Sequence, residues 1–429
     1  MTNNRSAAKP VHRPMFTNGE DIRIPLFALL KPDGQLYAGA SESSLDRDTA
    51  RRIYRAMLFT RVLDERMLAA QRQGRLSFYM QCTGEEAAVI GSTAALGDSD
   101  MIMAQYREQG ALAYRGFTTD EFMDQLFGNE RDPAHGRQMP IHYGSRDLHY
   151  LTISSPLATQ IPQATGYAYG QKLAGNGNCT LTIFGEGAAS EGDFHAALNM
   201  AAVHKVPVIF LCRNNGYAIS TPVAEQFAGD GVAARAFGYR MQSIRVDGND
   251  ILAMFEATRE ARRLAVEHNE PVLIEAMTYR LAAHSSSDDP SGYRSKKEEE
   301  AWRKKDPLAR MQRWLLDRDW WQEDEERELT ESLRRDVLET MKRAEKRRPP
   351  ALETLFSDVY ADVPPLLRQQ KRDLEAHIRR HSEAYPKSAP WLDEDTKGGQ
   401  DEGSGEDGKP GSGESQDEGF GENKKEGRA

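Results

Sequence analysis

Residues 180–220 contain side chains whose types and spacing could bind a metal ion together with a phosphate group. An apolar run ends at Gly185-Glu186-Gly187, a helical pattern follows, and a second apolar run ends at Arg213-Asn214-Asn215. A right-handed crossover through the helix makes the two apolar runs parallel strands, so that both end at the same edge of a sheet. Ligands of open α/β sheets bind at this carboxyl edge. The segment therefore predicts a binding site at residues 185–187 and 213–215.

The candidate metal ligands are all oxygen atoms. Glu186 offers an anionic oxygen, Asn215 offers an amide carbonyl oxygen, and the turn at Tyr217 offers a backbone carbonyl. Oxygen ligands suit Mg²⁺, which takes few protein ligands when phosphates complete its octahedron. The three residues are therefore interpreted as a magnesium site.

The neighbouring residues suit a diphosphate. Gly187 has no side chain to obstruct its approach, the backbone N–H groups near Ala188 can donate to it, and the guanidinium of Arg213 presents a planar set of donors. A Gly-x-Gly or an Asn-Gly pair alone is usually only a turn. Their occurrence together around one strand–helix–strand unit favours the functional interpretation.

The elements that position these residues follow from the apolar pattern. Residues 85–280 alternate apolar runs with helical stretches, which predicts an α/β fold with a mainly parallel sheet flanked by helices. Buried strands are expected at 179–184, 206–212 and 271–279, and helices at 46–75 and 251–268. Ser190, followed three residues later by Asp193, predicts a capping box at the start of the helix between the first two strands.

The two ends of the chain differ from this middle part. Residues 1–45 predict an extended arm, and residues 46–390 the α/β domain with charged C-terminal helices at 296–348 and 364–385. Residues 391–429 predict a disordered tail, because from 393 onward they contain 12 acidic and 5 basic residues with much glycine.

Composition excludes several classes of protein. That segment's charge of −7 leaves only about −3 of the chain's −10 for the body, so no basic surface for nucleic acid is expected. No apolar run is long enough to cross a membrane. The three cysteines are far apart and form neither a disulfide framework nor a CxxC metal site.

These residues belong to longer stretches that resemble one family. The 185–215 segment is similar to the thiamine-diphosphate motif, which begins with Gly-Asp-Gly and ends with Asn-Asn. It is most similar to the alpha subunits of branched-chain 2-oxo acid (2-oxoisovalerate) dehydrogenases, in which Glu replaces the Asp. The resemblance covers roughly residues 20–386 and includes SFYMQCTGEEA, QYREQG, GRQMPIHYG, ISSPLATQIPQATG, IRVDGND, LIEAMTYRLAAHSSSDDPSGYRS and LFSDVY.

The resemblance implies the cofactors thiamine diphosphate and Mg²⁺. Besides the residues already named, it implies that Tyr106, Arg107, Ser155 and Leu157 contact the cofactor, Leu157 supporting its bent form. It places His284 beside the thiazolium, where a group with a pKa near neutrality can assist proton transfer and acyl transfer to a lipoyl group.

The resemblance also implies two further sites. In similar enzymes of the branched-chain type, a K⁺ ion is bound by the residues that correspond to Ser154, Pro156, Thr159 and Gln160. Ser285 and Ser295 match positions that are phosphorylated in animal members. A phosphate there would repel the cofactor phosphates and disorder the loop.

The expected activity is oxidative decarboxylation of a branched-chain 2-oxo acid, such as 3-methyl-2-oxobutanoate, with transfer of the acyl group to lipoyl-lysine of an acyltransferase component. The resemblance implies an α₂β₂ heterotetramer, because a catalytic glutamate comes from a beta subunit. The expected location is the cytoplasm of a bacterium or the mitochondrial matrix of a eukaryote. A pyruvate or acetoin dehydrogenase alpha subunit, and a non-catalytic scaffold of the same fold, remain the alternatives.

Overall fold

The computed structural model describes residues 11–19 and 21–385, so the predicted tail at 391–429 lies outside the described residues. Its main feature is a six-stranded parallel sheet in the order β1-β7-β8-β4-β3-β2. The predicted α/β fold with a mainly parallel sheet is confirmed. The strands are β1 Leu26–Phe27, β2 Met101–Met103, β3 Thr180–Gly185, β4 Val208–Asn214, β5 Tyr217–Ala218, β6 Thr221–Pro222, β7 Gln242–Asp247 and β8 Val272–Met277, of which β5 and β6 form a separate antiparallel hairpin.

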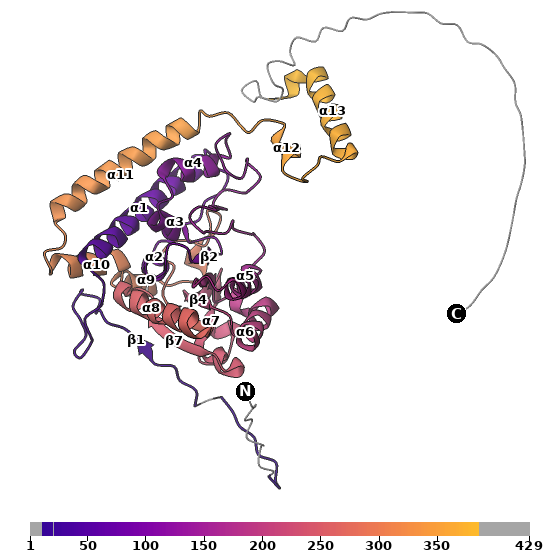
Figure 1. The fold of residues 1–429 in the computed structure, drawn as a ribbon. Coiled ribbons are helices and arrows are strands. Elements are labelled where there is room, and N and C mark those ends of the chain that lie inside the picture. Colours follow the sequence, from indigo (N-terminus) through magenta and orange to yellow (C-terminus); the bar gives the residue numbers. More distant parts are fainter. Residues whose placement is uncertain (1–10, 20, 386–429) are drawn as a thin grey trace, which may run out of the picture.

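Helices cover both faces of the sheet (Figure 1). α5 and α6 pack on one face, and α2 and α8 on the other, with α1 outside α2. The helices are α1 Arg47–Arg72, α2 Glu86–Ala94, α3 Gln109–Arg115, α4 Thr119–Phe127, α5 Gln160–Ala174, α6 Gly192–His204, α7 Val223–Gln226, α8 Ile251–His268, α9 Lys296–Arg303, α10 Pro307–Leu316, α11 Glu323–Ala344, α12 Thr354–Ser357 and α13 Pro365–Arg380.

The central strands are buried on both faces because their side chains alternate between two cores. In β4, Ile209 and Leu211 belong to the core under α2 and α8, whereas Val208 and Phe210 belong to the core under α5 and α6. A strand buried on both sides is mainly apolar. This is why its sequence shows a continuous apolar run, from which the strand is predicted.

Two predicted helices begin where the sequence places them, although α1 ends at Arg72, three residues before its predicted end. The carboxylate of Asp46 accepts hydrogen bonds from the backbone N–H groups of Asp48 and Thr49, and so caps α1. Asp250 caps α8 in the same way, and Asn269 ends it in the left-handed conformation with φ of 53°. The predicted helix at 251–268 is confirmed.

The predicted capping box at Ser190 is wrong. The chain forms a 3₁₀ turn at Ala188–Ser190, and α6 starts at Gly192 after Glu191, whose side chain makes no capping hydrogen bond. The tight turn allows the chain to pass from the end of β3 into the helix within a few residues.

The ends of the described chain return to the body. Within the predicted arm, Leu26 and Phe27 pair with Arg245 and Val246 of β7, so this segment supplies an edge strand of the sheet. α11 lies along α1 and contacts α4, whereas α12 and α13 lie beyond the end of α11 (Figure 1). The region predicted to be helical at 296–348 forms three helices, α9 to α11.

None of the described helices has both the length and the apolar character that a membrane span requires.

Candidate functional site

A cavity of about 360 Å³ lies at the carboxyl ends of β3 and β4. It brings together most of the residues predicted for the cofactor and the divalent ion. The predicted residues that line it are Tyr106, Arg107, Leu157, Glu186, Gly187, Ala188, Arg213, Asn215, Tyr217 and His284.

Glu186 and Asn215 meet across the ends of the two neighbouring strands. The backbone N–H of Asn215 donates to Oε2 of Glu186 at 3.3 Å, and the side chain of Gln226 donates to Oε1 at 3.4 Å. Both bonds are long, so this buried carboxylate is weakly satisfied by the protein. Burial raises the pKa of Glu186. A cation beside it would compensate the cost of burying its charge.

Arg213 is held by two buried carboxylates. Its Nη1 is 2.8 Å from Oε2 of Glu85, and its Nη2 is 2.5 Å from Oε1 of Glu108. Burial alone would lower the pKa of Arg213, but the charges of Glu108 and Glu85 outweigh it and hold the pKa above its ordinary value. The guanidinium is therefore a fixed positive charge in the cavity wall, and its buried Nε has no hydrogen-bond partner among the described residues.

Gly187 is required by the close approach of the β5–β6 hairpin. A Cβ added at this position would lie 2.8 Å from Cβ of Ala218, closer than real Cβ atoms approach one another. The backbone of Gly187 has a φ of −61°, which any residue can adopt. The constraint is therefore steric, and it comes from the hairpin that carries Tyr217.

Arg280 fixes the position of this hairpin. Its Nη2 donates to the backbone carbonyl of Ile219 at 2.8 Å, and its Nη1 lies 3.5 Å from the carbonyl of Tyr217. Ile219 has a φ of 57°, a conformation that is unfavourable for a β-branched residue. The bond from Arg280 thus stabilises a strained turn that lines the cavity.

The ring of His284 faces two positive charges. Its Nδ1 lies 3.2 Å from Nη2 of Arg107 and 3.4 Å from Nη1 of Arg280. Because both neighbours are donors, Nδ1 acts as acceptor and a neutral ring carries its proton on Nε2. Burial, together with the charges of Arg107 and Arg280, lowers the pKa of His284 to about 3, against the opposite effect of Asp288. The imidazole is thus neutral at physiological pH and a hydrogen-bond donor through Nε2, so the expected pKa near neutrality is wrong.

Of the loop before α5, only Leu157 lines this cavity. The hydroxyl of Ser155 lies 2.8 Å from Nε2 of His142, and the exposed Ser154 lies beside it. The hydroxyl of Thr159 donates to the carbonyl of Pro156 at 3.1 Å. Beyond these, Nε2 of Gln160 donates to the carbonyl of Ile183 in β3.

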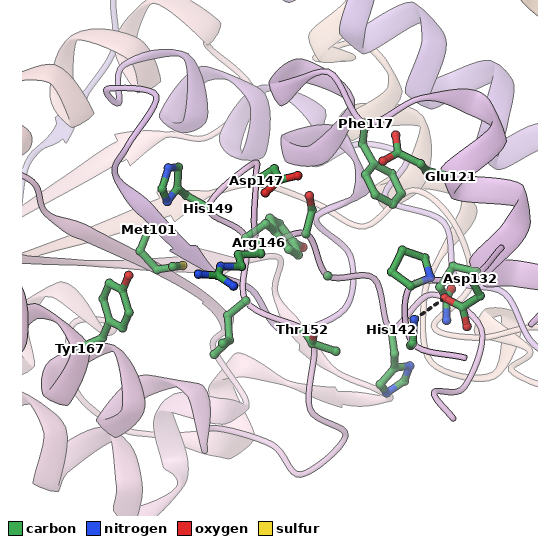
Figure 2. A pocket seen from close by; sticks show the side chains of 17 residues that line it. Met101, Phe117, Glu121, Asp132, His142, Arg146, Asp147, His149, Thr152 and Tyr167 are labelled. Carbon is green, nitrogen blue, oxygen red and sulfur yellow. Dashed lines mark hydrogen bonds between the residues drawn. The ribbon is translucent and has the colours of Figure 1, made fainter. Parts of the chain in front are cut away.

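A second, larger cavity has a volume of about 850 Å³, and the residues that line it are drawn in Figure 2. Met101, Arg146, His149 and Tyr167 line it, but none of the predicted site residues does. His142 lines it as well, and its Nε2 lies 2.8 Å from the hydroxyl of Ser155 in the loop before α5. Volume is a poorer guide to chemistry here than the convergence of acidic, amide and basic groups, so we assign the site to the smaller cavity.

The two candidate phosphorylation positions lie on either side of one loop. Ser285 is half-buried next to His284, and its hydroxyl is 3.2 Å from that of Ser287. Ser295 is exposed and caps α9 by accepting a bond from the N–H of Glu298.

Several residues of the site lack a local sequence signal. In the described part of the chain, His, Cys, Asp and Glu side chains form no cluster of three or more that could hold a metal, so an ion here would need amide, backbone or phosphate oxygens. Gln105 lines the cavity and accepts a bond from the N–H of Gly185 at 2.7 Å. Gln105, Glu108, Glu85 and Arg280 all lie in stretches that resemble the family, but their contacts with Gly185, Arg213, Asn215 and the hairpin carbonyls form only in the fold, and the sequence does not single them out.

Comparison with known proteins identifies the family. A family model described as the dehydrogenase E1 component matches residues 54–353. The chain is 48% identical over 364 residues to the mitochondrial 2-oxoisovalerate dehydrogenase subunit alpha of Mus musculus, which covers 85% of this chain and 82% of the relative. It is 47% identical to the corresponding subunit of Caenorhabditis elegans, covering 86% of each chain, and to the subunit alpha 2 of Arabidopsis thaliana, covering 87% and 80%. The chain therefore belongs to the family of dehydrogenase E1 components.

Proposed function

We propose that the chain is the alpha subunit of a branched-chain 2-oxo acid dehydrogenase and that it acts on acids such as 3-methyl-2-oxobutanoate. The E1 component family depends on thiamine diphosphate, and the relatives are named 2-oxoisovalerate dehydrogenase alpha subunits. The observation that carries the site is the meeting of Glu186 and Asn215 at one cavity, with the N–H of Asn215 3.3 Å from the carboxylate.

The donors of this cavity fit a magnesium diphosphate. The carboxylate of Glu186, the amide oxygen of Asn215 and the carbonyl of Tyr217 would bind Mg²⁺, while Arg213, Arg107 and the N–H groups at residues 187 and 188 would hold the diphosphate. The Nε atoms of Arg213 and Arg280 are buried without a hydrogen-bond partner in the described structure, which suits an anion.

The chain's own residues would position and protect the reaction. Thiamine diphosphate, when bound, supplies the carbon that attacks the 2-oxo group and accepts the electrons left when CO₂ departs. Tyr106 and Leu157 line the cavity and would support the rings of the cofactor. His284, neutral and with Nε2 protonated, would act beside them as a hydrogen-bond donor to the reacting atoms.

A K⁺ ion is proposed for the loop before α5. The hydroxyl of Thr159 and the carbonyl of Pro156 already lie 3.1 Å apart, and the hydroxyl of Ser154 and the amide of Gln160 belong to the same loop and the first turn of the helix. An ion there would fix Leu157 at the cavity wall. Ser155 is retained as a proposed cofactor contact through this loop, and Ser285 and Ser295 as proposed phosphorylation positions.

The relatives are named alpha subunits, which implies that they form a complex with other components. We propose an α₂β₂ heterotetramer in which the beta subunit supplies the glutamate that activates the cofactor, and a lipoyl acyltransferase that receives the acyl group. The proposed location is that of the complex: the mitochondrial matrix of a eukaryotic cell, or the cytoplasm of a bacterium.

Co-expression with a beta subunit tests the proposal. The purified complex should decarboxylate 3-methyl-2-oxobutanoate with a higher kcat/KM than pyruvate, and only with thiamine diphosphate and Mg²⁺. A preference for pyruvate would favour a pyruvate or acetoin dehydrogenase. A stable complex that binds no thiamine diphosphate in the presence of Mg²⁺ would favour a scaffold.

A further inference from the structure

Glu85 connects the two halves of the proposed site. It is fully buried and precedes α2, but its side chain makes no capping bond to that helix. Instead it reaches the end of β4, where Oε2 accepts from Nη1 of Arg213 at 2.8 Å and Oε1 accepts from Nδ2 of Asn215 at 2.7 Å. One carboxylate thus holds two side chains that lie two residues apart on the same strand end.

The bond to Asn215 decides which atom of its amide is available to a cation. Because Glu85 takes Nδ2, the carbonyl oxygen Oδ1 must point the other way, where it accepts from the N–H of Tyr217 at 3.2 Å. With the amide turned over, its N–H groups would face the ion position, and an amide nitrogen with two hydrogens cannot bind a cation. A carboxylate accepts bonds only, so it permits just one of the two orientations.

We propose that Glu85 is a positioning residue for Mg²⁺. It presents the oxygen of Asn215 to the ion and holds Arg213 beside it, although it touches neither the ion nor the diphosphate. The inference rests on the proposed function of the cavity. Partners of metal ligands typically affect metal affinity by about 10- to 100-fold when they are replaced.

A purely structural ion pair between Glu85 and Arg213 is the simpler explanation. It predicts a loss of thermal stability on substitution but no selective change in the Mg²⁺ requirement. Glu108 offers a control for the ion pair, because it is also buried and pairs with the same guanidinium; its Oε2 accepts from the N–H groups of Gln105 and Tyr106, and no hydrogen bond joins it to Asn215.

The test exchanges the carboxylate at position 85 with the amide at position 215. In Glu85→Gln, the amide can donate to Asn215 and allow it to turn over. In the double variant Glu85→Gln/Asn215→Asp, the Gln amide donates to one carboxylate oxygen of residue 215 while the other faces the ion. The double variant therefore preserves the net charge, the hydrogen bond and an oxygen at the ion position.

The measurement is made by calorimetry on the complex with its beta subunit. Thiamine diphosphate is kept at a saturating concentration, and the Mg²⁺ concentration at which half of the complex has bound the cofactor is determined. We expect the Mg²⁺ midpoint to rise by at least about tenfold in Glu85→Gln, to change less in Glu108→Gln, and to recover in the double variant. A smaller rise in Glu85→Gln, an equal rise in Glu108→Gln, or no recovery in the double variant would overturn the inference. If Glu85→Gln fails to assemble, Glu85→Asp, which is too short to hold both partners, is judged by the same criterion.

Failure of the proposed function would look different. In that case the wild-type complex itself would bind no thiamine diphosphate at any Mg²⁺ concentration. If the wild type binds with a Mg²⁺ requirement that Glu85→Gln leaves unchanged, only the role of Glu85 is refuted.

Discussion

The contact between Gly187 and Ala218 leads to a quantitative prediction. In Gly187→Ala the new Cβ would lie 2.8 Å from Cβ of Ala218, whereas ordinary contacts begin at 3.4 Å, so the two segments must separate by at least about 0.6 Å. Overpacking of this kind costs about 1–3 kcal/mol. The hairpin that must move carries the carbonyl of Tyr217, so we expect thiamine diphosphate affinity to fall by about 5- to 150-fold, the equivalent of that energy.

The assay is calorimetric titration of thiamine diphosphate into the heterotetramer at fixed Mg²⁺, with thermal unfolding measured in parallel. Gly192→Ala is the matched control, because no atom lies within 4 Å of its added Cβ, and it should bind as the wild type does. Gly187→Ala/Ala218→Gly should restore affinity, since the nearest atom is then Cα of residue 218 at 3.6 Å. Equal affinities of Gly187→Ala and Gly192→Ala, or recovery of stability without affinity in the double variant, would refute this reasoning.

Three further predictions concern pH, the hairpin and the fold. The pKa of His284 is about 3 in the folded protein and near 6.5 in the unfolded chain, so the unfolded chain takes up a proton first and the protein loses stability as pH falls below 6.5. The free energy of unfolding of His284→Asn, measured by urea denaturation, should therefore decline less than that of the wild type between pH 6.5 and 5. A parallel decline in the two proteins would contradict the low pKa. Arg280→Lys keeps the charge but replaces the two nitrogens that face the hairpin carbonyls with one, so the hairpin should be held less firmly and cofactor affinity should fall; wild-type affinity would exclude a clamping role. Asp46→Ala removes the cap of α1 and should lower unfolding free energy by about 1 kcal/mol, and an unchanged value would show that the cap is dispensable.

The parts of the fold that could be predicted are those with a strong local pattern. β3, β4 and β8 are mainly apolar because both faces of the sheet are covered, and α8 is bounded by the capping residue Asp250 and the left-handed Asn269. β1 and β2 have only two and three residues, too few to show any periodicity. Their pairing with distant strands decides their conformation.

In the site, too, only the contacts that follow from a local pattern could be predicted. Glu186 and Asn215 could be predicted to meet, because a strand–helix–strand unit determines where its strands end. The 3₁₀ turn at Ala188–Ser190 could not, since the local pattern of Ser190 followed by Asp193 indicates a capping box instead. Glu85 joins Asn215 across 130 positions of sequence, so only the folded chain reveals that contact.

The most direct test of the account is the removal of the proposed acidic metal ligand. In Glu186→Ala we expect the complex with the beta subunit to assemble but to lose Mg²⁺-dependent thiamine diphosphate binding, measured by calorimetry. Glu186→Asp, which keeps a carboxylate, should retain part of that dependence. If Glu186→Ala binds the cofactor with wild-type affinity and the same Mg²⁺ requirement, the strand-end site is not where the metal diphosphate binds.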